Sequence, residues 1–464
     1  MSALGAQTWR RPITLEAVAS GLDQRTAEAA QRLQVPGVAV GVLFDRREHV
    51  FTHGVTSVDN PLPVTADTLF QIGSITKTFT ATAAMRLVAG GQLRLDAPVR
   101  EYVPDLSLAD PESAARVTVR ELLQHTGGWS GDFFVDTGLG EDALTRFVAR
   151  LGELDVLAAP GEVFSYNNAA FSLAGRVIEV VTGKPVEEAI RELVLQPLGL
   201  SNTFFDPDEV MTRRFAVGHI VYPDRVGVTR PWRLPRNANA AGGLISTVRD
   251  QLAYARFQMG SGEEEVISAD IRRLMQTPAV DAGPGGWIGI AWMVRDVGGV
   301  RVVSHGGATN GQLSAFEMVP ERKFAVTVLT NADRGAELHR EVVRWALEAY
   351  LGVVEDEPRT LDLSKERRAE YLGTYRTMQS TFEVTDEDGE LAVRPVKVDV
   401  PAAFRSAESP PPPLPPAAQI RLVSPDGFVV ARGPTRGATG FFRRDPSGHV
   451  VWMNFGGRLA RRVS

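Results

Sequence analysis

The chain has 464 residues, of which 44% are hydrophobic and 23% charged, a balance typical of a globular protein with a sizeable core. Its 50 basic and 56 acidic side chains leave a net charge of −6, so we expect no nucleic-acid partner. The absence of cysteine excludes disulfides, zinc–thiolate sites and a cysteine nucleophile. The sequence shows neither an apolar run of about 20 residues nor a signal peptide. We therefore expect a cytoplasmic protein with no membrane partner, or a periplasmic or secreted one if a signal was removed.

The first 90 residues predict a helix, a hairpin and a second helix. Residues 14–34 form the first helix, and 36–45 and 49–58 are two strands joined by a polar turn at 46–48. From Ser74 the pattern turns helical, and apolar residues stand on nearly every side of this predicted helix until it stops at Gly90-Gly91. That pattern is typical of a buried central helix.

The middle of the chain is richer in helix signals. Thr118 and Thr247 each begin a capping box, and 169–182 is an amphipathic stretch that stops at Gly183. Strand signals then return at 287–294, 299–304, 312–319 and 323–330, followed by a helix at 334–351. The pattern predicts a sheet built from both ends of this segment, with a mostly helical layer inserted between them.

The last hundred residues form a separate unit in this interpretation. We expect a first domain over 1–351, a linker over 352–366 and a β domain over 367–464, where Asp-Gly and Ser-Gly turns separate alternating runs. The proline-rich segment 409–416 is predicted to be an exposed, extended loop.

Ser74 and Lys77 begin the apolar helix, three residues apart and therefore on one face. Serine is a weak nucleophile until a neighbouring base takes its proton. A lysine can be that base if burial and the helix N-terminus lower its pKa. The backbone N–H of Ser74 can also point at a developing oxyanion. Such a tetrapeptide is common by chance, but this lysine stands in an otherwise apolar helix.

A second motif joins Tyr166 to Asn168, in a loop before the helix at 169–182. Tyrosine can act as a general base if nearby cations lower its pKa, and asparagine offers a donor and an acceptor to a substrate amide. Taken alone, a packing tyrosine and a helix N-cap explain the same residues.

The third motif is His305-Gly306-Gly307-Ala308, at the end of a strand. The glycines let a substrate backbone approach the strand edge, and the backbone N–H of Ala308 is a candidate second oxyanion donor. His305 is a candidate to hold a positive charge or to relay a proton. The simpler interpretation is a hairpin turn with an incidental histidine.

The order and surroundings of the three motifs closely resemble the serine β-lactamase and penicillin-binding-protein superfamily, with its Ser-x-x-Lys, Tyr-x-Asn and Lys-or-His-x-Gly motifs. Flanking segments agree, and they resemble the branch that holds class C β-lactamases, esterases and D-amino-acid peptidases: FQIGSITKTFTA, VTVRELLQHTGG, PGEVFSYNNAAFSLAG, QPLGLSNTFF, AAGGLISTVRD and SHGGATNG. The resemblance covers roughly 14–350. The segment YLGTYR at 371–376 is similar to the opening of small lipocalin-like barrels appended to some members.

The resemblance implies an α/β (α+β) fold, with an antiparallel sheet flanked by helices, a mostly helical lobe and a small C-terminal β-barrel. It assigns acylation to Ser74, and proton transfer to Lys77 and Tyr166. It also implies roles for the following residues: substrate contact by Asn168, Gly307 and Ala308, an oxyanion hole of the Ser74 and Ala308 amides, and His305 at the site of the family's strand cation. His125 belongs to a family-like segment and is interpreted as structural support.

Two departures reduce the case for a true β-lactamase. His305 replaces the usual lysine and Gly306 the hydroxyl residue after it, which weakens capture of a carboxylate. We expect an esterase, amidase or peptidase that works through an acyl-enzyme on a small-molecule or short-peptide substrate. The alternatives are a true β-lactamase or D-Ala-D-Ala carboxypeptidase, a penicillin-binding protein without turnover, and an acyltransferase. No cofactor and no metal site are expected, since no His-Glu-x-x-His pattern is present, and a homo-oligomer is left open.

Overall fold

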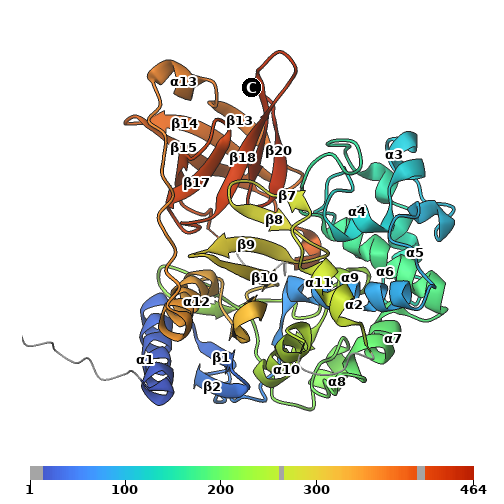
Figure 1. Ribbon diagram of the computed structural model, residues 1–464, viewed down its shortest axis with the longest axis vertical. Helices are drawn as coiled ribbons and strands as arrows, with labels where there is room; N and C mark the ends of the chain where they lie inside the picture. The colour runs from blue at the N-terminus through green and yellow to red at the C-terminus, as the bar shows by residue number, and fades with distance from the viewer. Residues whose placement is uncertain (1–13, 261–265, 405–412) are drawn as a thin grey trace, which may run out of the picture.

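The computed structural model describes residues 14–260, 266–404 and 413–464 (Figure 1). A large antiparallel sheet crosses its centre, a helical lobe lies to one side, and a β-barrel stands above (Figure 1). This arrangement confirms the predicted fold class. The assignment of 352–366 as a linker stays a prediction, although 352–364 has no regular secondary structure.

The central sheet has eight strands in the order β2-β1-β12-β11-β10-β9-β8-β7. The strands are β1 (Gly37–Phe44), β2 (Arg47–Gly54), β7 (Val280–Asp281), β8 (Gly286–Ile288), β9 (Met293–Val297), β10 (Val300–Ala308), β11 (Leu313–Val319) and β12 (Phe324–Thr330). The N-terminal hairpin pairs through β1 with β12, the last of these strands in chain order, with Val38 opposite Thr330. Both ends of the segment therefore build one sheet, as predicted.

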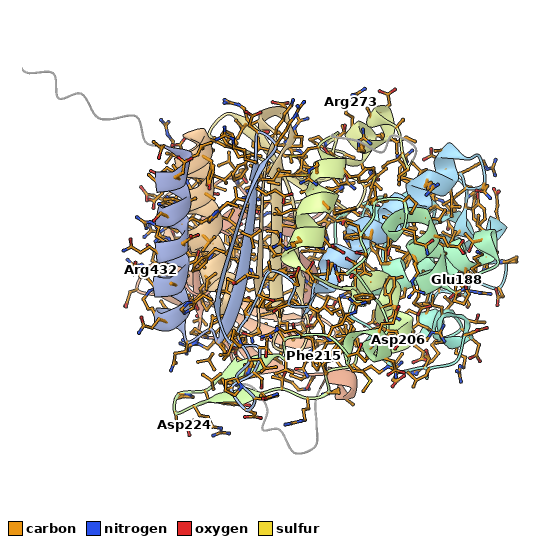
Figure 2. The ribbon with its side chains drawn as sticks, turned by 90° about the horizontal axis from the view of Figure 1, so that it is seen from below. Glu188, Asp206, Phe215, Asp224, Arg273 and Arg432 are labelled. Atoms are coloured by element: carbon orange, nitrogen blue, oxygen red, sulfur yellow. The ribbon has the colours of Figure 1, made fainter. Side chains whose placement is uncertain are left out.

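Helices cover both faces of this sheet. On one face α1 (Leu15–Leu33) and α12 (Gly335–Leu351) lie side by side, and on the other lies α10 (Val248–Gln258) (Figure 2). Alternate residues of β1 point to opposite faces of the sheet. Val38 and Val40 belong to the hydrophobic cluster that includes α1 and α12, and Ala39 belongs to the cluster that includes α10. Because β1 is buried on both sides, its sequence is continuously apolar rather than alternating.

The helical lobe is inserted between β2 and β7. A 3-10 turn, η1 (Gly73–Ile75), leads into the central helix α2 (Thr76–Ala89), which is buried along almost its whole length. The helices packed around or near it are α3 (Pro111–Arg116), α4 (Val119–Leu123), α5 (Ala143–Val148), α6 (Asn168–Thr182), α7 (Val186–Ile190), α8 (Pro207–Val210), α9 (Asn239–Gly242) and α11 (Ala269–Met275). Two small sheets pair β3 (Phe70–Gln71) with β6 (Ile245–Ser246) and β4 (His219–Val221) with β5 (Val226–Val228).

The C-terminal unit is a closed barrel preceded by α13 (Lys365–Ala369). Its eight strands are β13 (Gly373–Arg376), β14 (Ser380–Glu387), β15 (Glu390–Val398), β16 (Ala418–Leu422), β17 (Gly427–Arg432), β18 (Thr439–Arg444), β19 (Val450–Phe455) and β20 (Arg458–Arg462). Tyr371 and Tyr375 are fully buried, and the Tyr375 hydroxyl donates to the Tyr371 carbonyl at 2.8 Å. Both tyrosines of the segment YLGTYR therefore lie in the hydrophobic core of the barrel.

Three local predictions were wrong. The expected strand 287–294 is split into β8 and β9, because the Ala291 N–H turns away to the Leu123 carbonyl at 2.9 Å and Ala291 has a φ of 61°. The first hairpin turns at Asp45 and Arg46, both with positive φ, rather than at 46–48. Thr247 caps α10 through the Asp250 N–H, but the Asp250 carboxylate is engaged by Thr203 instead of completing a box.

Two further observations concern whole segments. Residues 409–412 of the predicted proline-rich loop lie outside the described residues, and 413–416 have no regular structure. In the part of the chain that the structure describes, no helix is long and apolar enough to cross a membrane.

Candidate active site

Ser74 lies in the turn η1, and Lys77 in the first turn of α2. The Lys77 side chain is fully buried. Its Nζ is within hydrogen-bond distance of Ser74 Oγ (3.0 Å), the Asn168 side-chain oxygen (2.7 Å) and the Ala241 carbonyl (2.6 Å). Burial, reinforced by the positive charge of Arg458, holds the pKa of Lys77 well below its ordinary value. A neutral amine donates one N–H to each of the two carbonyl-type oxygens, so its lone pair remains for the Ser74 proton.

Tyr166 completes the contact with the serine. Its hydroxyl and that of Ser74 share a hydrogen bond, and its ring stacks on His125 at 4.2 Å. His125 Nδ1 in turn accepts the Asn167 N–H at 2.9 Å, which fits the structural role expected of His125. Burial raises the pKa of Tyr166, and Arg458 offsets this only in part. The condition that nearby cations bring the pKa of Tyr166 toward neutrality is therefore not met, and the resting phenol is protonated.

Asn168 is the first residue of α6, and the helix N-cap is Asn167, whose side chain accepts the Ala170 N–H. The Asn168 amide is thus free of capping. Its oxygen accepts from Lys77, and its nitrogen donates to Asp132 at 2.6 Å.

Strand β10 lies directly against the Ser74 turn. A Cβ added to Gly307 would come within 1.9 Å of the Ile72 carbonyl oxygen, and one added to Gly73 within 2.6 Å of the Ala308 nitrogen. This close approach needs glycine at both positions. It places the backbone amides of Ser74 and Ala308 at the same edge of the sheet.

The β10 edge is open beyond Ser304. Strand β9 pairs with β10 only as far as Ser304, so 305–308 has a neighbouring strand on the β11 side alone. Gly306 and Ala308 are exposed. An extended substrate backbone can therefore lie beside this edge and offer its carbonyl oxygen to the Ala308 amide.

His305 does not supply a cation. It is 2% exposed, and its Nδ1 is 2.6 Å from the Gly306 carbonyl oxygen. Because a carbonyl only accepts, Nδ1 carries the hydrogen and Nε2 has a lone pair, for which no partner exists among the described residues. Burial lowers the pKa of His305 to about 3. Of the two candidate roles of His305, holding a positive charge is therefore not supported at neutral pH.

The barrel contributes residues that the sequence did not reveal. Arg458, at the start of β20, has its guanidinium carbon 4.6 Å from the Tyr166 ring centroid, and its Nε donates to Asp132 at 3.0 Å. The Tyr166 N–H donates to the Gly457 carbonyl at 2.7 Å, and the Gln379 amide donates to the Asp132 carbonyl at 2.9 Å. The sequence around Asp132 gives no sign of Arg458, because this partner is more than 300 residues away in the chain.

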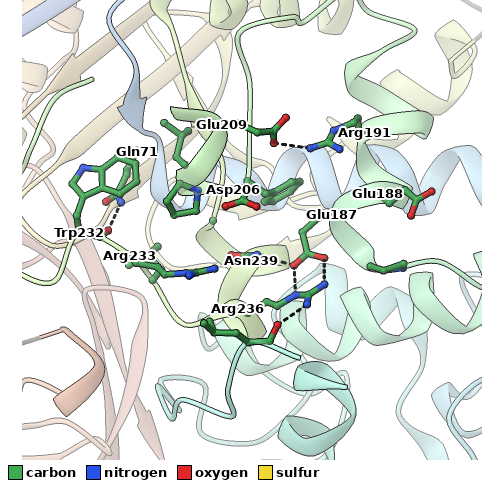
Figure 3. Close-up of a pocket in the computed structure, with 17 residues that line it drawn as sticks. Gln71, Glu187, Glu188, Arg191, Asp206, Glu209, Trp232, Arg233, Arg236 and Asn239 are labelled. Carbon is green, nitrogen blue, oxygen red and sulfur yellow. Dashed lines mark hydrogen bonds and ion pairs between the residues drawn. The ribbon is translucent and has the colours of Figure 1, made fainter. Parts of the chain in front are cut away.

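A separate cavity of about 430 Å³ lies beside the site (Figure 3). Glu187 bridges Arg236 and Asn239 there, with the Asn239 amide donating to Glu187 at 2.7 Å (Figure 3). Ser74 and Lys77 do not line this cavity, which is bounded by Asn239 of α9, the helix whose Ala241 carbonyl receives Lys77. The hydrogen bond of Asn239 to Glu187 thus contacts the same short helix that accepts from Lys77.

The fold and this site define a serine β-lactamase-like protein. The family model described as Beta-lactamase matches residues 22–351, which is most of the chain. The chain belongs to that family, whose members are serine hydrolases.

Individual relatives extend the comparison. The chain is 34% identical over 363 residues to penicillin-binding protein 4 of Amycolatopsis lactamdurans, covering 74% of this chain and 93% of that protein. The crystal structure of SurE superposes with a TM-score of 0.75 at 28% identity and covers 97% of this chain and 100% of SurE; SurE has also been solved with D-Leu. A D-amino acid amidase from Ochrobactrum anthropi gives a TM-score of 0.61 at 25% identity, covering 72% of this chain and 98% of the amidase.

Proposed function

We propose that this protein is a serine hydrolase that forms an acyl-enzyme on Ser74 and acts on ester or amide bonds of small molecules or short peptides. The observation that carries the proposal is the convergence of Lys77 and Tyr166 on the Ser74 hydroxyl. A nucleophile within hydrogen-bond reach of a base of lowered pKa is the arrangement that covalent catalysis requires.

Acylation begins with the neutral amine of Lys77. It takes the proton of Ser74 as Oγ attacks the substrate carbonyl carbon, and the negative charge on the carbonyl oxygen is held by the Ser74 and Ala308 amides. Tyr166 gives its proton to the leaving group as the ester or amide bond breaks, and regains one from Lys77. These steps leave an acylated serine, a released alcohol or amine, and both side chains in their starting state.

Deacylation reverses the roles with water. Lys77 accepts a proton from water as the water oxygen attacks the acyl carbon, and Tyr166 gives its proton to Ser74 Oγ as it leaves and regains one from Lys77. Both steps use the same oxyanion donors.

The charges of the site favour substrates without a carboxylate next to the scissile bond. His305 is neutral at neutral pH, and burial lowers the pKa of Lys77. The cation of Arg458 is already paired with Asp132. We therefore expect weak turnover of β-lactams. The D-residues in the names of SurE with D-Leu and of the D-amino acid amidase support a preference for D-configured groups.

The alternatives differ from this proposal either in the substrate or in the fate of the acyl-enzyme. A true β-lactamase or D-Ala-D-Ala carboxypeptidase would turn over carboxylate-bearing substrates, and the resemblance to a penicillin-binding protein favours an adduct that persists. An acyltransferase would pass the acyl group to an amine or alcohol instead of water.

A substrate panel tests the proposal. It contains p-nitrophenyl esters, L- and D-amino-acid amides, nitrocefin and a D-Ala-D-Ala peptide, with Ser74→Ala as the control. We expect turnover of neutral esters and D-amides well above that of nitrocefin. Fast nitrocefin hydrolysis would establish the β-lactamase instead. Product analysis with an added amine separates acyl transfer, and a stable adduct without product indicates a binding protein.

A further inference from the structure

A continuous series of polar contacts joins the barrel to the catalytic lysine. Arg458 donates to the Asp132 carboxylate, which accepts from the Asn168 amide nitrogen, while the Asn168 oxygen accepts from Lys77. Asp132 is in a loop between α4 and α5, and its side chain is 16% exposed. None of these contacts involves Ser74, so the series is additional to the acylation chemistry.

The orientation of the Asn168 amide decides what Lys77 meets. A carboxylate accepts only, so Asp132 selects the nitrogen end of the amide and turns the oxygen end toward Lys77. With the amide reversed, an NH₂ group would face the amine, and Lys77 would lose one of its two carbonyl-type acceptors. Its lone pair would then no longer be directed to Ser74 by its partners.

Asp132 needs a partner of its own because a carboxylate in a mostly buried position is unfavourable without one. Arg458 supplies it, with Nε 3.0 Å from one carboxylate oxygen and Nη2 3.4 Å from the other. Arg458 is held in place by the neighbouring turn, where its Nη1 donates to the Gly456 carbonyl at 2.9 Å. The barrel therefore fixes the position of Asp132.

We propose that Asp132 is a positioning residue for Lys77, acting through the Asn168 amide, and that Arg458 of the barrel completes it, so that the C-terminal domain is an integral part of the active site. The effect of this pair on turnover rests on the hydrolase function proposed above, whereas the contacts of Asp132 with Arg458 and Asn168 do not.

The two members of the pair have opposite electrostatic effects on Lys77. Arg458 lowers the pKa of Lys77 and Asp132 raises it. The other titratable groups that face the amine are Tyr166, His125 and His305, which are identical in every variant of the pair. A merely structural contact would not move the pH dependence in opposite directions.

The test compares Asp132→Asn, Arg458→Gln and the double variant with the wild type. The matched control is Arg443→Gln, which removes another ion pair between barrel and catalytic domain, that of Arg443 with Glu162 at 2.7 Å. Two readouts are used: kcat and KM on the best ester of the panel, and the rate at which a fluorophosphonate labels Ser74. In labelling, the serine oxygen displaces fluoride from phosphorus and Lys77 takes the proton. Thermal unfolding of each variant checks that it is folded.

We expect each single substitution in the pair to lower kcat and the labelling rate by about 100-fold, with a small change in KM. The double variant should lose no more than the worse single one, because both residues act through one contact. The acid limb of the kcat profile should move to lower pH in Asp132→Asn and to higher pH in Arg458→Gln. Arg443→Gln should match the wild type.

Folded Asp132→Asn and Arg458→Gln proteins with wild-type kcat and labelling would overturn the inference, as would losses that add in the double variant. The hydrolase proposal fails separately. If the wild type turns over no member of the panel, labelling still reports on Lys77, and a 100-fold fall in labelling would support the pair while the function is rejected. If unfolding shows that a single variant does not fold, Arg458→Lys, which keeps the charge but loses the two-point contact, should show the same slowing of labelling. Wild-type labelling by Arg458→Lys would also overturn the inference.

Discussion

The guanidinium carbon of Arg458 lies 4.6 Å from the centroid of the Tyr166 ring, so a residue near the end of the chain touches a tyrosine of the proposed catalytic site. The contact is supported by the backbone hydrogen bond from Tyr166 to Gly457. The barrel is thus docked on the loop that carries the phenol.

Tyr166→Phe should slow turnover by about 100-fold or more, because a positioned proton donor contributes that much to such reactions. The phenol is 5% exposed and its ring packing is kept by phenylalanine, so we expect little change in melting temperature. Steady-state kinetics on the best ester and a thermal melt measure both. A normal rate would leave all proton transfer to Lys77.

The activity should depend on an ionisation well below that of an ordinary lysine. Lys77 acts as a base only when neutral, and burial lowers its pKa, so kcat/KM should rise with pH through that lowered value and then level off. Lys77→Arg should abolish the activity at every pH, because arginine stays protonated. A pH–rate profile checks this. Activity that rises only near the ordinary lysine pKa would show that Lys77 is charged at rest.

Gly307→Ala should damage both stability and activity. The new Cβ would lie 1.9 Å from the Ile72 carbonyl oxygen, so β10 must separate from the Ser74 turn. We expect the free energy of unfolding to fall by about 2 kcal/mol or more, together with most of the turnover. Gly306→Ala is the matched control, since its nearest contact is at an ordinary 3.5 Å. Denaturant unfolding should rank Gly307→Ala well below Gly306→Ala, and equal values would contradict the tight contact.

His339 should contribute to loss of stability in acid. Its Nε2 and the Thr330 hydroxyl are 2.9 Å apart, and burial lowers its pKa to about 3 from an ordinary 6.5. Between these values the unfolded chain binds a proton that the folded protein does not, so stability falls as pH decreases. His339→Gln should reduce the slope of unfolding free energy against pH by about 1.4 kcal/mol per pH unit. Urea unfolding at pH 4 to 6 measures the slope, and an unchanged slope would mean that His339 is protonated in the fold.

The sequence predicted the elements that local pattern specifies. Helix α6 ends where Gly183 adopts a left-handed conformation, and β12 is a mostly apolar strand buried along its whole length. The split of β8 from β9 was missed because it depends on a hydrogen bond to Leu123, far away in the chain.

The same distinction holds for the site. Ser74 and Lys77 are neighbours on one helix, so their contact follows from spacing alone. The burial of His305, which lowers its pKa to about 3, and the pairing of Asp132 with Arg458 could not be predicted from local sequence, because both depend on how distant elements pack. The resemblance to a family assigned Tyr166, but not the high pKa of its phenol, which arises from how deeply the loop is covered.

Mass spectrometry of the intact protein during turnover tests the central claim most directly. With a slowly hydrolysed ester, we expect the wild type to gain the mass of one acyl group and then lose it, with the adduct mapped to Ser74. Ser74→Ala should remain folded, gain no mass and release no product. An adduct on another residue, or full turnover by Ser74→Ala, would contradict the account.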